Sequence, residues 1–126
     1  MLDTNIVIYI RDGMIPRSRL ERLPAGSAVM SIVSYGELYF GAKKRRIHAA
    51  GTLELITSLV PPVVMDLEVA KTYGEIRADL MARGEPIGAN DTWIAAHAIT
   101  LRTTLVTNNE REFRRVKGLK IENWLR

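Results

Sequence analysis

The chain has 126 residues, the size of one typical domain, so we expect a single domain over residues 1–126. It has no cysteine, which excludes disulfides, thiolate metal sites and cysteine nucleophiles. Its net charge of +4 weakly favours a polyanionic partner such as RNA. Because neither a signal-peptide pattern nor a long apolar run is present, we expect a cytoplasmic protein with no membrane association.

Short apolar strands and helices alternate along the chain. The expected strands are Met1–Asp3, Ala28–Ile32, Val63–Met65, Thr103–Thr107 and Lys120–Glu122. The expected helices are Asn5–Arg11, Pro16–Leu23, Ser34–Arg46 with Ser34 as its N-cap, Ala49–Leu59, a long helix that Asp66 caps and that ends at Arg83-Gly84, and Asp91–Leu101. This alternation predicts an α/β fold whose parallel sheet is covered by helices on both faces.

Two of the expected helices have recognisable apolar faces. In the long helix after Asp66, apolar residues recur at helical spacing and are expected to face the core; they are Leu67, Ala70, Tyr73, Ile76 and Leu80. The helix Asp91–Leu101 is almost wholly apolar, which predicts that it is buried. His97 within it is expected to be a core residue.

Acidic residues follow the strands of the predicted sheet. Asp3 ends the first strand, Glu37 lies early in the helix after the second, and Asp91 opens the apolar helix. Asn109 and Glu112 follow the strand Thr103–Thr107. Because ligands bind beyond the carboxyl ends of parallel strands, we expect these residues at one edge. Clustered carboxylates repel one another, and oxygen ligands without cysteine favour Mg²⁺ or Mn²⁺ over Zn²⁺.

Each acid also has an explanation without catalysis. Asp3 is a possible N-cap, and Ser34-Tyr35-Gly36-Glu37 matches a capping box in which Glu37 reaches back to the Ser34 amide. Asp91 in a first turn is stabilised by the helix dipole. Glu110 and Glu112 suit a solvated turn, and Glu112 is the better site candidate of the two. The catalytic interpretation is favoured because all these acids are expected at the same edge of the sheet.

Four motifs in order resemble PIN-domain ribonucleases, and more narrowly the VapC toxins of bacterial type II toxin–antitoxin pairs. They are Leu2-Asp3-Thr4-Asn5, Tyr35-Gly36-Glu37-Leu38, Pro86-Ile87-Gly88-Ala89-Asn90-Asp91 and Leu105-Val106-Thr107-Asn108-Asn109. The resemblance implies a three-layer α/β/α PIN fold with a mostly parallel central sheet. It also implies Mg²⁺-dependent cleavage of RNA, often tRNA, a homodimer, and a cognate VapB-like antitoxin.

The resemblance assigns roles to residues. Asp3, Glu37 and Asp91 would be the principal catalytic acids, with Asp3 and Asp91 as metal ligands. Thr4 and Asn5 would shape the site. Many relatives have an aspartate where this chain has Asn109, so Glu112 is expected to replace that charge.

Two other functions remain open at this stage. One is a phosphotransfer domain phosphorylated at Asp3, although no lysine stands at the position that such chemistry needs. The other is a non-catalytic RNA-binding module whose acids only cap helices.

Overall fold

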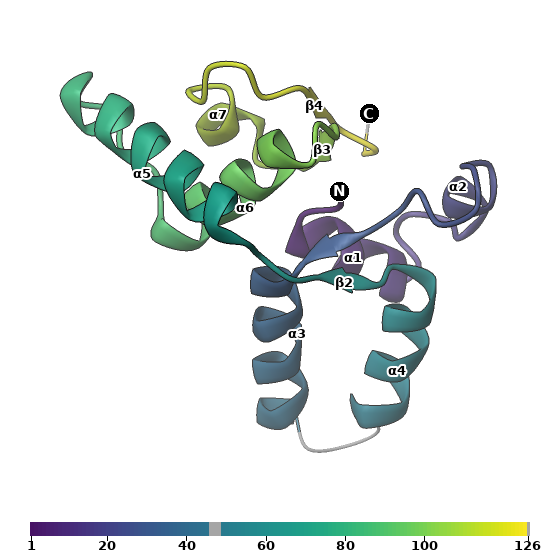
Figure 1. Ribbon diagram of the computed structural model, residues 1–126. Coiled ribbons are helices and arrows are strands. Elements are labelled where there is room, and N and C mark those ends of the chain that lie inside the picture. Colours follow the sequence, from purple (N-terminus) through teal and green to yellow (C-terminus); the bar gives the residue numbers. More distant parts are fainter. Residues whose placement is uncertain (46–48, 126) are drawn as a thin grey trace.

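The strands of the protein are short and all parallel. A computed structural model describes residues 1–45 and 49–125 (Figure 1). The strands are β1 (Met30–Ser31), β2 (Pro62–Val63), β3 (Leu105–Val106) and β4 (Ile121–Glu122). The helices are α1 (Thr4–Arg11), α2 (Ser18–Glu21), α3 (Ile32–Arg45), α4 (Ala49–Leu59), α5 (Leu67–Ala82), α6 (Ala89–Thr100) and α7 (Glu110–Phe113).

The first three residues join two separate strand pairs. β1 pairs with β2 and β3 pairs with β4, both in parallel. Leu2 forms a parallel bridge with Val106, and its amide donates to the Val29 carbonyl at 2.8 Å. The Asp3 amide donates to the Val106 carbonyl at 2.9 Å. The backbone order is therefore β2, β1, residues 1–3, β3, β4.

Alternate residues of the central strands fill two cores. Leu2 and Val106 belong to one core, with α1, α3 and α4. Met1 and Leu105 belong to the other, with α5, α6 and α7. Figure 1 shows these two sets of helices on opposite sides of the strands. Because successive strand side chains point to opposite faces, this division produces the expected three-layer α/β/α arrangement.

Most expected elements are confirmed, with ends that differ by at most two residues, but the expected strand Met1–Asp3 is reduced to an isolated bridge at Leu2. α4 has the expected bounds, and the Asp66 carboxylate accepts from the Val69 amide at 3.1 Å to cap α5. The N-cap at Ser34 is wrong, because α3 begins two residues earlier, directly after β1. Its expected end near Arg46 lies outside the described residues. The short helix α7 replaces the expected solvated turn.

The apolar face expected for α5 is partly wrong. Leu67 is 69% exposed and Ala70 is exposed, whereas Val69 and Leu80 are buried. Each residue advances a helix by 100°, so residues three apart are not exactly aligned and repeated steps of three move around the axis. Leu67 and Ile76, nine residues apart, therefore lie on opposite sides of the helix. The face that packs on α6 is therefore centred on Val69 and Leu80.

No helix within the described residues is both long and apolar enough to cross a membrane.

Replacing Phe113 by alanine should strongly destabilise the fold. The ring is fully buried and anchors α7 against the second core. Loss of a buried phenyl group leaves a cavity, so we expect the free energy of unfolding to fall by about 3–5 kcal/mol in urea denaturation. Met81→Ala is the matched control, since Met81 is 59% exposed. Equal stability of the two variants would contradict this packing.

Candidate acidic active site

Asp3 directly follows Leu2, the residue that bridges to Val106. Asp3 is 5% exposed and forms the N-cap of α1. Its Oδ1 accepts a hydrogen bond from the Thr4 amide, and its Oδ2 accepts one from the Thr107 hydroxyl, each at 2.8 Å. The Thr107 hydroxyl in turn accepts from the Asn109 amide at 2.9 Å. The carboxylate orientation is thus set by groups from both neighbouring elements.

Glu37 binds Thr4, the residue after Asp3, and not the start of its own helix. The Thr4 hydroxyl donates to Glu37 Oε1 at 2.8 Å. The proposed capping box is wrong, because Ser34 is not at the N-cap of α3 and the Glu37 carboxylate is occupied by Thr4. Glu37 is exposed, so its second oxygen is available to solvent.

Asp91 and Glu112 are connected through Asn109. The Asn109 side-chain amide donates to Glu112 Oε2 at 3.1 Å and to Asp91 Oδ2 at 3.4 Å. Asp91 lies in the first turn of α6, and Glu112 lies on α7. The side-chain amide of Asn109 therefore links two neighbouring acids from different helices.

The four acids Asp3, Glu37, Asp91 and Glu112, called here the acidic cluster, are electrostatically coupled. Burial, then repulsion from Asp3, Glu112 and Glu37, and last a hydrogen bond with Glu112 together raise the pKa of Asp91 to about 6. Burial also raises the pKa of Asp3, while the bonds from Thr107 and Thr4 counteract that effect. The edge where the strands end thus concentrates negative charge.

The donor chemistry of the acidic cluster fits a hard divalent cation. Carboxylate oxygens are the ligands that Mg²⁺ and Mn²⁺ prefer, and a cation would relieve the repulsion felt by Asp91. Within the described residues, no three Asp, Glu or His side chains already converge tightly enough to form a complete metal cage. Asp3 and Asp91 could hold the ion together with water, which Mg²⁺ usually retains.

Other predicted positions differ in how they relate to this cluster. Thr4 contacts it directly, whereas Asn5 is exposed and no hydrogen bond of its side chain is found within the described residues. His97 is fully buried with Nδ1 2.9 Å from the Ser31 hydroxyl, in agreement with a core position. Thr107 was not among the predicted site residues. Its place directly after β3, at the same edge as Asp3, was the signal available in the sequence.

The sequence matches the PIN domain family model over residues 1–119. Ribonuclease VapC1 of Haemophilus influenzae (strain R2866) is 36% identical to it, over 98% of this chain and 96% of that protein. The tRNA(fMet)-specific endonuclease VapC of Shigella flexneri is 39% identical, over 98% and 96% of the two chains.

Solved structures agree with this similarity. A chain of VapBC-1 from nontypeable Haemophilus influenzae superposes with a TM-score of 0.89 at 35% identity, covering 100% of this chain and 98% of that one. A chain of VapBC2 from Rickettsia felis, solved with a DNA fragment from its promoter, has a TM-score of 0.91 at 34% identity over 98% and 97% of the two chains.

Replacing Asp91 by asparagine should stabilise the protein at neutral pH. Asp91 protonates near pH 6 in the folded state and near its ordinary 3.8 when unfolded. A raised pKa stabilises the fold at low pH, and this contribution is lost as the pH rises through 6. We expect Asp91→Asn to gain about 1–2 kcal/mol in urea denaturation at pH 7.5, a range reduced for partial solvent screening, and little at pH 4.

Asp12→Asn is the matched control for this comparison. A hydrogen bond from Arg11 lowers the pKa of Asp12, so its carboxylate stabilises the fold at neutral pH and its removal should give no gain. If Asp91→Asn were less stable than the wild type at pH 7.5, the repulsion within the acidic cluster would be refuted.

Proposed function

Because the chain belongs to the PIN domain family, and within it to the VapC ribonuclease toxins of toxin–antitoxin systems, we propose that its acidic cluster performs Mg²⁺-dependent cleavage of RNA. The observation that carries this proposal is the position of Asp91 beside the three other acids at the edge where the strands end, where burial and then repulsion from these acids raise its pKa to about 6. Partly buried carboxylates that repel one another form a site that a cation would stabilise.

The residues of the acidic cluster take different roles in this proposal. Asp3 and Asp91 would hold Mg²⁺, with Mn²⁺ as a substitute, because Asp3 is buried and Asp91 is half-buried, whereas Glu37 is exposed. The bound ion would supply Lewis-acid stabilisation of the phosphate and acidify water. Glu37 has one oxygen held by Thr4, so its other oxygen is free to accept a proton from the attacking water.

Asn109 and Glu112 complete the far side of the cluster. The Asn109 amide keeps Glu112 beside Asp91 without adding charge at its own position. Glu112 therefore provides the fourth carboxylate of the site, which would orient water or the substrate from α7. Thr4 would shape the opposite side through its bond to Glu37.

The two other functions considered from the sequence are less well supported. Phosphorylation of Asp3 requires an accessible carboxylate, but this side chain is 5% exposed and both of its oxygens accept hydrogen bonds. A non-catalytic module is contradicted by ribonuclease relatives that match nearly the whole chain.

We propose tRNA as the substrate and a small antitoxin as the regulator. Two relatives, from Shigella flexneri and Salmonella typhimurium, are named as tRNA(fMet)-specific endonucleases. Similar chains occur in VapBC complexes from Haemophilus influenzae and Rickettsia felis. The protein would act on cytoplasmic RNA and be held inactive by a VapB-like antitoxin.

Asp91→Asn should abolish Mg²⁺-dependent cleavage while the fold remains intact. The substitution removes a proposed metal ligand and keeps the shape of the side chain, so we expect at least about a hundredfold loss in rate and a weaker calorimetric signal for Mg²⁺. Cleavage of total cellular RNA, followed by mapping of the new 5′ ends, measures the loss and identifies the substrate.

The control for cleavage is again Asp12→Asn, which makes the same chemical change on the exposed end of α1 and should retain full activity. Undiminished cleavage by folded Asp91→Asn would refute the assignment of the acidic cluster. A mapped site outside tRNA would refute only the proposed substrate.

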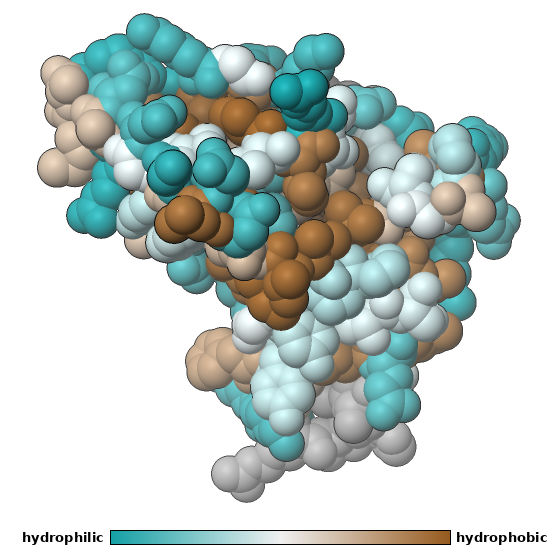
Figure 2. Space-filling view, in the orientation of Figure 1, coloured by the Kyte–Doolittle hydropathy of each residue, from teal (hydrophilic) through white to brown (hydrophobic). Residues whose placement is uncertain are grey.

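The protein should form a homodimer in solution. Figure 2 shows apolar side chains over the connection between β2 and α5, where Val64 is 75% and Leu67 69% exposed. Burial of such a patch by a second copy would remove apolar surface from water. Light scattering should give twice the 14.2 kDa chain mass, and Leu67→Lys should reduce it. A monomer at micromolar wild-type concentration would refute the dimer.

A further inference from the structure

Phe40 is a large aromatic side chain that serves no core. It is 68% exposed and lies on α3 three residues after Glu37. Residues three apart on a helix are neighbours on one face, so Phe40 lies one turn further along the face that carries Glu37. Glu37 in turn is close enough to Asp91 to contribute to its raised pKa. The exposed ring therefore lies directly beside the acidic cluster.

The space next to this ring is open. Gly41 follows Phe40 and is four residues after Glu37, which places it on the same face of α3. A Cβ atom added at Gly41 would meet no heavy atom within 4 Å. The surface of α3 at Gly41, next to Phe40, is thus not covered by a side chain from another element.

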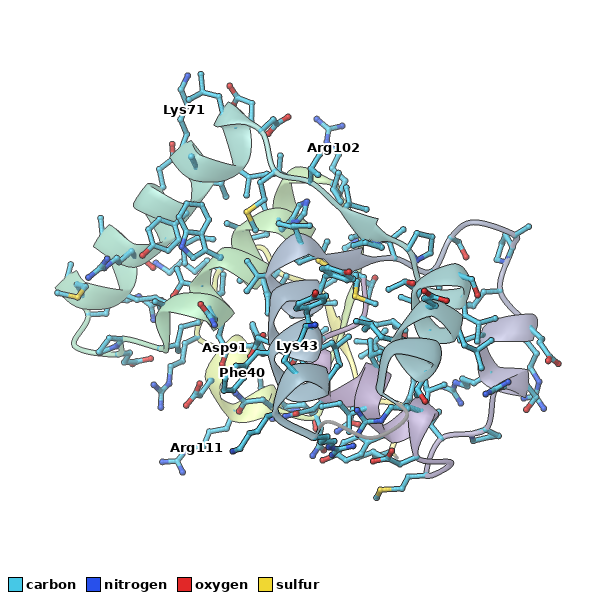
Figure 3. All side chains as sticks on the ribbon, turned by 90° about the horizontal axis from the view of Figure 1, so that it is seen from below. Phe40, Lys43, Lys71, Asp91, Arg102 and Arg111 are labelled. Atoms are coloured by element: carbon cyan, nitrogen blue, oxygen red, sulfur yellow. The ribbon has the colours of Figure 1, made fainter. Side chains whose placement is uncertain are left out.

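Cationic side chains lie on the same side of the molecule as the Phe40 ring (Figure 3). Lys44 is seven residues after Glu37, again on the same face, and the Lys43 ammonium lies 5.3 Å from the centre of the Tyr39 ring. Figure 3 shows Phe40 and Lys43 on α3, and Arg111 on α7, on the side of the molecule that carries Asp91. Neither Lys44 nor Arg111 forms an ion pair within the described part of the chain.

We infer that Phe40 positions the substrate by stacking on a nucleobase near the scissile phosphate, while Lys44 contacts the phosphate backbone beyond it. This inference rests on the proposed function, because the acidic cluster defines where the RNA is cut. An exposed ring between a cleavage site and unpaired cations combines the two components with which proteins bind single-stranded nucleic acid, a stacking platform and a positively charged path.

The geometry of α3 limits which nucleotide is bound. Phe40 lies about 4.5 Å beyond Glu37 along the helix axis, since each residue rises 1.5 Å. A strand whose scissile phosphate is at the acidic cluster would therefore present to Phe40 a base within about one or two nucleotides of the cut. Any base can stack on an aromatic ring, so Phe40 would strengthen RNA binding and fix the position of the strand relative to the acidic cluster. It would contribute less to the choice of RNA sequence.

Steady-state cleavage of a fluorophore–quencher oligoribonucleotide that spans the mapped site tests this role. We expect Phe40→Ala to raise KM about tenfold or more with kcat changed less than about threefold, because stacking on one aromatic ring accounts for such a factor in affinity. Phe40→Trp should restore KM and Phe40→Leu should not, since leucine is apolar but cannot stack. Met14→Ala, which removes another exposed apolar side chain, should behave as wild type.

Substrates with a single abasic nucleotide locate the contact. The wild type should bind more weakly when one particular nucleotide near the cut is abasic. The affinity of Phe40→Ala should not change when that same nucleotide is abasic. Lys44→Ala should reduce the slope of log binding constant against log salt concentration by about one, because one phosphate contact is lost. Lys71→Ala is its control, since Lys71 lies far from Asp91 in Figure 3 and pairs with Glu68 at 3.6 Å.

The outcomes separate this inference from the proposed function. Fluorescence anisotropy in the Asp91→Asn background measures RNA binding without cleavage, so Phe40 is tested whether or not the acidic cluster is catalytic. Unchanged affinity and an unchanged abasic profile in folded Phe40→Ala would overturn the stacking role; a ring that serves only a protein partner would give this result. Retained cleavage by Asp91→Asn alone would overturn the proposed function instead.

Discussion

Insertion of the first three residues between two short strand pairs is the interaction on which the rest of the structure depends. Leu2 and Asp3 donate backbone hydrogen bonds to Val29 on one side and Val106 on the other. Without these bonds, β1–β2 and β3–β4 would be separate two-residue pairings, too short to be stable alone. The same segment directs Met1 into one core and Leu2 into the other, so it determines how both helical layers pack.

This insertion also places Asp3 where charge is hardest to accommodate. The carboxylate is buried at the carboxyl end of the central strand, and hydrogen bonds from Thr4 and Thr107 compensate for part of its desolvation. Asp91 accepts a longer bond, 3.4 Å, from the Asn109 side chain, and burial followed by repulsion from the other acids raises its pKa to about 6. The Thr4 amide and the Thr107 hydroxyl thus compensate the Asp3 carboxylate, whereas the ionised form of Asp91 is less well stabilised.

The surroundings of the acidic cluster match a nuclease that binds a flexible strand. Its carboxylates come from the N-cap of α1 and from α3, α6 and α7, so their arrangement depends on the complete fold. α3 contributes both Glu37 to the cluster and Phe40 to the adjoining surface. A single rigid helix would thus align cleavage chemistry with substrate positioning, in a protein whose family cleaves RNA.

The sequence by itself determined features that depend on neighbouring residues. Apolar periodicity and capping predicted α4 and the start of α5 at Asp66, and the order of short strands and helices predicted a parallel α/β sheet with acids at its edge. Tertiary structure decided the features that depend on distant partners. Glu37 bonds to Thr4 across 33 residues instead of capping its own helix, and Thr107 reaches Asp3 across 104 residues. The buried face of α5 is the one that packs on α6, and it includes Val69 and Leu80 but not Leu67, which apolar character alone assigns to the core. Local propensity acts within a few residues, whereas a site is formed by side chains that only the folded sheet brings together.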